Sequence, residues 1–194
     1  MIFGKSKVQH CTSMVGNKMF HATIDVCRNG EFSKIKLDEL HGGWVVLFFY
    51  PADFTFVCPT ELFELTQMYD EFKRLGVEVI SVSTDSLETH KDWSEKSEKI
   101  AAIKYLMGSD VHGEMSKKLG VYSEHDHCCF RATVIIDPSG VIRVHEVNSI
   151  EIGRSAEELL RKIQALDYVR MHPDELCPAS WKPGQKTLNL TKKL

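Results

Sequence analysis

The spacing of apolar residues changes several times along the chain, and each change marks a new structural element. Residues 22–26 and 32–37 flank the turn Arg28-Asn29-Gly30, and Asn-Gly between two such segments predicts an N-terminal β-hairpin. Residues 44–50 (WVVLFFY) are continuously apolar, as expected for a strand that is buried on both faces of a sheet. The chain is therefore expected to begin with a hairpin and a central strand.

The middle of the chain alternates between helical and extended patterns. Apolar residues recur at helical spacing over residues 60–75, and Gly76 ends that pattern. Residues 77–83 (VEVISVS) predict the next strand, and residues 86–98 predict a polar helix. Residues 99–110 form a region with a looser pattern.

The last part of the chain predicts a short helix, a second hairpin and a closing amphipathic helix. Ser155 has the residue type of an N-cap for the closing helix, because a glutamate follows three residues later. The four elements span residues 113–119, 132–137, 141–147 and 155–171.

This order of elements predicts an α/β protein with the thioredoxin fold, in which a mixed central sheet is flanked by helices. An N-terminal β-hairpin precedes that fold. Residues 172–194 have no clear period and are expected to form an extended C-terminal arm. We therefore expect one domain over residues 1–194, of which residues 172–194 are the arm.

Composition and charge exclude several classes of function. The sequence is 43% hydrophobic and 26% charged with a net charge of -3, which is typical of a soluble globular protein. It has no basic run of the kind that nucleic-acid binding needs, and its longest apolar run is too short to span a membrane. The N-terminus lacks the apolar core of a signal peptide, so we expect a cytoplasmic protein with reduced cysteines.

The stretch FFYPADFTFVCPTELF, residues 48–63, places a cysteine where the predicted helix begins. The strand stops before Pro51, and Cys58 directly precedes Pro59, which suits the first helical position. Free N–H groups and the helix dipole stabilise an anion there, so a Cys58 thiolate would be a nucleophile. Glu61 is expected to reach back as in a capping box. A buried core cysteine is the commoner alternative.

A thioredoxin-type reductase would need a second cysteine where Glu61 stands, which argues against dithiol exchange within one motif. Pro51, Thr55 and Cys58 instead have the spacing P-x-x-x-T-x-x-C, and the chain resembles the typical two-cysteine peroxiredoxins. The resemblance continues through VSTDSLETHKDW, FRATVIIDPSG, IGRSAEELLRKI and CPASWKPGQKTL. It covers nearly all of the chain after the first twenty residues or so.

The resemblance implies a role for five residues. Cys58 would be the peroxidatic cysteine, Pro51 would shield it from water, and Thr55 would hydrogen-bond the peroxide. Arg131 would hold the thiolate and polarise the O–O bond, as a fixed guanidinium can; the alternative is a surface ion pair. Cys177 would be the resolving cysteine, supplied by the partner subunit; the alternative is an idle surface thiol.

The resemblance also implies the reaction and its partners. The protein would reduce hydrogen peroxide and organic hydroperoxides, form an intersubunit Cys58–Cys177 disulfide, and be recycled by thioredoxin or a flavoprotein disulfide reductase, without a cofactor. We expect a homodimer, and five dimers in a ring with Phe54 and Thr89 near the dimer–dimer contact. Trp181 would anchor the arm on a neighbouring subunit. A holdase for unfolding chains and a redox relay are alternative functions.

The chain departs from the family pattern in two places. It lacks the Gly-Gly-Leu-Gly insertion and the tail Tyr-Phe pair of overoxidation-sensitive relatives, which predicts a robust enzyme. The segment EHDHCCF holds His125, His127, Cys128 and Cys129, whose side chains are zinc ligands in other settings. Their spacing suits one tight metal site poorly, so we expect packed cysteines and solvated histidines. These two cysteines are the alternative source of a resolving thiol.

Overall fold

A computed structural model describes residues 13–191. Cys11 lies outside this range, and so does the N-terminal segment in which we expect no signal peptide. A seven-stranded sheet forms the centre of the fold, in the order β2-β1-β5-β4-β3-β8-β9. Its strands are β1 (Thr23–Arg28), β2 (Glu31–Lys36), β3 (Trp44–Phe49), β4 (Val77–Ser83), β5 (Leu106–Ser109), β8 (Arg131–Ile136) and β9 (Ile142–Asn148).

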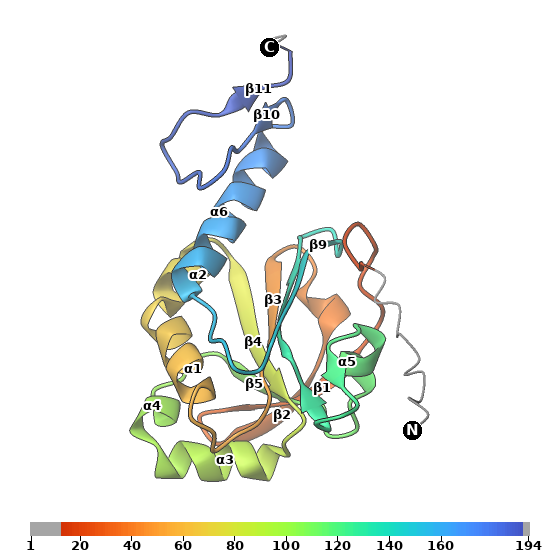
Figure 1. The fold of residues 1–194 in the computed structure, drawn as a ribbon, viewed down its shortest axis with the longest axis vertical. Helices are drawn as coiled ribbons and strands as arrows, with labels where there is room; N and C mark the ends of the chain where they lie inside the picture. Colours follow the sequence, from red (N-terminus) through yellow and green to blue (C-terminus); the bar gives the residue numbers. More distant parts are fainter. Residues whose placement is uncertain (1–12, 192–194) are drawn as a thin grey trace, which may run out of the picture.

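Helices cover both faces of this sheet (Figure 1). The helices α1 and α6 contribute to the core on one face, together with α2, and α5 contributes to the core on the other face. The helical elements are η1 (Leu37–Leu40), α1 (Cys58–Gln67), α2 (Tyr69–Arg74), α3 (Leu87–Lys96), α4 (Glu98–Ala101), α5 (Glu114–Lys118) and α6 (Ala156–Met171). Within residues 13–191, no helix is long and apolar enough to cross a membrane.

The sheet is mixed, as the sequence predicts. β3 pairs in parallel with β4, and β4 pairs in parallel with β5. β8 joins the other side of β3 in antiparallel register, and β9 follows it as the edge strand. At the first hairpin, Asn29 and Gly30 have φ values of 53° and 78°, as a type I′ turn requires. The α/β thioredoxin fold class is therefore confirmed.

The prediction of one continuous helix over residues 60–75 is wrong. The segment forms two helices, α1 and α2, that meet at Met68. The carbonyl of Leu62 accepts hydrogen bonds from the Thr66 hydroxyl at 2.9 Å and from the Tyr105 hydroxyl at 2.8 Å. A side-chain bond back to the carbonyl four residues earlier competes with the helical ladder and bends helices.

The segment 99–110 is more regular than its pattern predicts. It contains the end of α4 and the strand β5, which lies between β1 and β4. The strand is short, and a Cβ at Gly108 would lie 2.6 Å from the Ile24 side chain. Close packing between neighbouring strands therefore requires glycine where strand propensity would disfavour it.

The arm folds back on the helix that precedes it. Its strands β10 (Glu175–Leu176) and β11 (Leu188–Asn189) pair with each other beyond the free end of α6 (Figure 1). Trp181 is 1% exposed, and its ring lies 4.9 Å from the ring of Tyr168 on α6. The expectation that Trp181 anchors the arm on a neighbour is therefore wrong for this conformation, because the side chain is buried within its own chain.

Candidate active site

Cys58 is the first residue of α1, and its thiol is fully buried. Pro59 follows it in the first turn, and the preceding residue, Val57, caps the helix with no side-chain hydrogen bond. The first N–H groups of α1 therefore have no side-chain acceptor at the N-cap, and they favour negative charge at the helix start. The predicted position of this thiol is confirmed.

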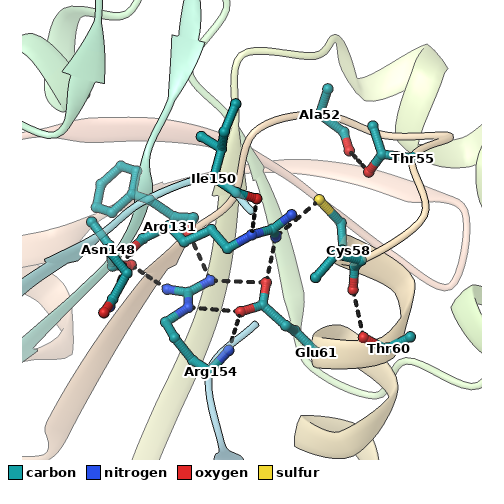
Figure 2. A network of polar contacts seen from close by, with 12 residues as sticks. Ala52, Thr55, Cys58, Thr60, Glu61, Arg131, Asn148, Ile150 and Arg154 are labelled. Atoms are coloured by element: carbon teal, nitrogen blue, oxygen red, sulfur yellow. Dashed lines mark hydrogen bonds and ion pairs between the residues drawn. The ribbon is translucent and has the colours of Figure 1, made fainter. Parts of the chain in front are cut away.

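Arg131, the first residue of β8, brings its guanidinium to the sulfur (Figure 2). Its Nη1 lies 3.3 Å from Cys58 Sγ and 2.7 Å from Glu61 Oε2. Its Nε donates to the carbonyl of Ile150 at 2.7 Å. The guanidinium is nearly completely buried, so its position is fixed from several sides. The alternative of a surface ion pair is excluded.

Glu61 does not form the predicted capping box. Its carboxylate is buried and instead accepts hydrogen bonds from Arg131 and from a second arginine, Arg154. The Arg154 backbone N–H and Nε lie 2.7 and 2.9 Å from Glu61 Oε1. Two buried guanidiniums attract the carboxylate more strongly than a backbone N–H can.

Arg154 is a further site residue, and its role is not predictable from the sequence pattern. Its Nη2 donates to the carbonyl of Phe49 at 2.9 Å and its Nη1 to that of Ala132 at 2.7 Å. Its guanidinium carbon lies 3.4 Å from the centre of the Phe48 ring. Burial lowers the pKa of Arg154 below its ordinary value, and the pairing with Glu61 opposes that shift. Arg154 thus ties α1, β3 and β8 together behind the thiol.

The groups beside the sulfur carry more positive than negative charge. Arg131 and Arg154 are two buried guanidiniums, and Glu61 is the one buried carboxylate that both of them contact. Negative charge beside Arg131 would therefore be paired with a fixed cation, as buried charge requires. The arrangement can therefore hold a thiolate away from water and stabilise negative charge on an oxygen bound beside it.

Pro51 and Thr55 lie on the loop between β3 and α1. Pro51 is buried, and the Thr55 hydroxyl donates to the carbonyl of Ala52 at 2.9 Å. Because that bond uses the hydroxyl hydrogen, the oxygen keeps lone pairs that can accept a hydrogen bond from a substrate. Figure 2 shows this bond on the same side of the site as the Cys58 sulfur.

Asp53, which is part of this loop, forms a buried ionisable pair with His90 of α3 that no sequence pattern signals. Asp53 accepts from the Tyr50 hydroxyl at 2.7 Å and lies 2.7 Å from His90 Nδ1. The other ring nitrogen of His90 lies 3.2 Å from the carbonyl of Gly108. Both ring nitrogens face acceptors, so the imidazolium form fits this setting. Burial alone would lower the pKa of His90, but these partners raise it above its ordinary value.

Cys177 is not next to Cys58 in the single chain. It lies on the arm, half-buried, with Sγ 3.8 Å from the carbonyl of Ala165 on α6. Figure 1 shows the arm beyond the free end of α6, on the opposite side of the molecule from the start of α1. The pKa of Cys177 is raised by burial, while Arg161 opposes this shift.

The segment EHDHCCF forms a loop and half of a small β-ladder. His125 and His127 are exposed, Cys128 is half-buried and Cys129 is buried, as predicted. Burial raises the pKa of Cys129 to about 12. Across residues 13–191, these side chains belong to no cluster of three or more potential metal ligands.

Comparison with known proteins places the chain in a family. Residues 15–145 match the AhpC/TSA family. The chain is 47% identical over 176 residues to alkyl hydroperoxide reductase C of Salmonella typhimurium and of Escherichia coli, with 91% of this chain and 94% of each relative covered. It is similar in structure to Enterococcus faecalis AhpC, with a TM-score of 0.83, 41% identity, and coverage of 86% of this chain and 100% of that one.

A second solved structure extends this likeness. The reduced 2-Cys peroxiredoxin of Plasmodium vivax has a TM-score of 0.86 and 33% identity, covering 91% of this chain and 93% of that one. The resemblance predicted from the sequence motifs is thus confirmed. Because the family match spans most of the chain, this chain belongs to the AhpC/TSA family and is a peroxiredoxin, an enzyme that reduces peroxides with a cysteine thiol.

Proposed function

We propose that Cys58 is the peroxidatic cysteine of this enzyme, that Pro51, Thr55 and Arg131 complete its peroxide site, and that Cys177 is the resolving cysteine. The observation that carries the proposal is the 3.3 Å contact between Cys58 Sγ and Arg131 Nη1 at the start of α1. A fixed positive charge and a helix N-terminus meet at one sulfur atom, and both favour the thiolate, which is the nucleophilic form.

In the first step the Cys58 thiolate attacks the terminal oxygen of the peroxide. An S–O bond forms while the O–O bond breaks, so the sulfur is oxidised to a sulfenic acid and the peroxide is reduced. The other oxygen leaves with the bonding electron pair, takes up a proton, and departs as water or an alcohol. Arg131 stabilises the charge that develops on the oxygens, and Thr55 accepts a hydrogen bond from the peroxide.

In the second step the partner subunit's Cys177 condenses with the Cys58 sulfenic acid, releasing water and forming an intersubunit disulfide. A disulfide needs Cα atoms within about 7 Å of each other, and the arm of the same chain is remote from Cys58 in this conformation (Figure 1). A second subunit is therefore the better source of the thiol. The first turn of α1 must unwind, and the arm must leave α6, before the sulfurs meet.

The assembly is proposed to be a homodimer, with five dimers in a ring. Exposed apolar side chains on the edge strand β9 and on the arm, namely Val147, Leu176 and Leu188, support a subunit contact. Phe54 is half-exposed, its ring lies 5.9 Å from that of Trp93 in a tilted arrangement, and it fits a dimer–dimer contact. The proposed substrates are hydrogen peroxide and small organic hydroperoxides. The proposed reductant is thioredoxin or a flavoprotein disulfide reductase, and the proposed location is the cytoplasm.

Peroxide turnover, coupled to thioredoxin or to a flavoprotein disulfide reductase in separate assays, tests the proposal. Cys58→Ser should abolish turnover, and Arg131→Lys should slow it about tenfold or more because lysine lacks the planar fork. Cys177→Ser should remove the peroxide-induced dimer band on a non-reducing gel, whereas the matched change Cys128→Ser, at the other half-buried cysteine of residues 13–191, should leave both turnover and the dimer band intact. Normal turnover by Cys58→Ser would show that another thiol is peroxidatic.

A further inference from the structure

The C-terminal arm is held along one face of α6 by contacts that follow each other in order. Three residues of the helix contact three residues of the arm, and the pairs are Arg161–Trp181, Ala165–Cys177 and Tyr168–Glu175. The helix residues are spaced four and three positions apart, which places them on one face. Because the arm residues come in the reverse order, the arm runs antiparallel to the helix, and Cys177 has a contact with α6 on either side of it.

Glu175 joins three segments at the end of the arm that is nearer to the end of α6. Its Oε2 accepts a hydrogen bond from the Tyr168 hydroxyl at 2.8 Å and a second hydrogen bond from the Thr187 hydroxyl. Tyr168 belongs to α6, Glu175 opens β10, and Thr187 directly precedes β11. The bonds from Thr187 and Tyr168 lower the pKa of Glu175 below its ordinary value, and hydrogen bonds to an ionised acceptor are the stronger kind. We call Tyr168, Glu175 and Thr187 the arm latch.

The Tyr168 ring is fixed by aromatic contacts that do not involve its hydroxyl. The His172 ring stacks on it at 4.1 Å with an angle of 15° between the planes, and the Trp181 ring lies 4.9 Å away. A hydroxyl on a fixed ring loses little conformational freedom when it binds an acceptor. Tyr168→Phe therefore removes the bond to Glu175 while the ring contacts remain.

Cys177 follows the latch by two residues and is held with it. Its side chain is half-buried, and its Sγ lies 3.8 Å from the Ala165 carbonyl on α6. A thiol in this position is remote from any start of α1 until the arm leaves the helix (Figure 1). Opening of the arm must therefore precede disulfide formation, and the rate of that step scales with the fraction of arms that are open.

We infer that the arm latch, with Glu175 as its central residue, holds Cys177 on α6 and determines how fast Cys177 resolves the sulfenic acid on the partner subunit's Cys58. The inference rests on the proposed resolving role of Cys177. Glu175 is a positioning residue, because it controls when the thiol is available and touches no reacting atom. In the step that it controls, an S–S bond forms between the two sulfurs, the S–O bond of the sulfenic acid breaks, and the hydroxyl leaves as water with the thiol proton.

The test measures two rates in the reduced full-length protein. Alkylation of Cys177 by N-ethylmaleimide, located by peptide mapping, reports opening of the arm without any peroxide. Disulfide-linked dimer, trapped at short times after one equivalent of hydrogen peroxide, reports resolution. Tyr168→Phe and Glu175→Gln should each raise both rates by about threefold to tenfold, the range that the loss of one hydrogen bond gives. Neither variant should change the rate at which Cys58 first reacts with peroxide.

The chain offers a matched control beside the latch. Asp174 is the exposed neighbour of Glu175, and its backbone carbonyl accepts from the Leu190 N–H at 2.9 Å. Asp174→Asn removes the same charge one residue away and should change neither rate. Tyr168→Phe/Glu175→Gln should be little faster than Glu175→Gln, because both changes act on the same bond. Thr187→Val breaks the other bond of the latch and should act in the same direction, so the test does not depend on one variant folding.

The two rates also separate this inference from the proposal on which it rests. Equal alkylation of Cys177 in the wild type and in Tyr168→Phe would refute the latch, whichever thiol resolves Cys58. Faster alkylation with an unchanged or slower rate of disulfide formation would overturn its control of the resolving step. A peroxide-induced dimer that persists in Cys177→Ser would instead refute the resolving role of Cys177.

Discussion

Glu61→Gln tests whether the buried charge cluster holds the site together. The Glu61 carboxylate accepts from Arg131 at 2.7 Å and from Arg154 at 2.7, 2.9 and 3.3 Å. An amide keeps the shape but removes the charge, and it turns an NH₂ group toward a guanidinium. Two guanidiniums that are 4% and 6% exposed would lose their carboxylate. Removing one partner of a buried ion pair costs about 3–5 kcal/mol.

The same substitution at an exposed pair is the control. Glu158 makes two comparable hydrogen bonds to Arg161, at 2.7 and 2.9 Å, but is 46% exposed. Exposed pairs contribute about 0–1 kcal/mol, so Glu158→Gln should change the free energy of unfolding by no more than that.

Urea unfolding of the reduced proteins measures the free energy of unfolding of Glu61→Gln and of Glu158→Gln. All measurements use one protein concentration, because the stability of an assembly depends on concentration. Glu61→Gln should also slow the reaction with peroxide, since Arg131 loses its fixed position. Equal losses of stability in Glu61→Gln and Glu158→Gln would refute the argument that burial makes the cluster structural.

Three further predictions follow from other parts of the molecule. The raised pKa of His90 should give stability that is fully present below pH 6.5, the ordinary pKa of histidine, and that is lost as pH rises through the raised pKa, a loss that His90→Gln should flatten in urea unfolding. Because the chain lacks the motifs of overoxidation-sensitive relatives, mass spectrometry after many turnovers at high peroxide should find little sulfinic acid on Cys58. Rapid inactivation would contradict the prediction of a robust enzyme. Trp181→Ala should expose the arm to limited proteolysis without slowing the first reaction of Cys58 with peroxide, because Trp181 contacts Tyr168 and Arg161 on α6 and Gln185 on the arm.

Local patterns in the sequence were enough to predict most of the fold and the position of the thiol. Cys58 was predictable because its helix start, Pro59 and the end of the central strand are adjacent in the chain. Arg154 was not, because its contact with Glu61 joins residues 93 positions apart. An arginine directly before the Ser155 N-cap was the only local signal, and arginines at helix starts are commonly exposed.

The Asp53–His90 pair and β5 escaped prediction for related reasons. His90 lies in a segment with the polar pattern of a surface helix, yet the tertiary fold turns it completely inward. A lone histidine on a polar helix carries no sign of a buried carboxylate partner 37 residues away. β5 is too short for its period to be read, and Gly108 lowers its strand propensity. In each case the information lies in packing between distant segments.

The site combines a rigid half with a mobile half, and this division fits the two steps of the reaction. Arg131 begins a strand inside the sheet, and Arg154 is tied to the carbonyls of two strands, so the charges that stabilise the peroxide oxygens are fixed. Cys58 begins a helix with no side-chain cap, and a missing cap leaves such a start less stable by about 1 kcal/mol. The thiol can thus leave by unwinding one turn while the arginines stay in place, because no strand of the sheet has to move.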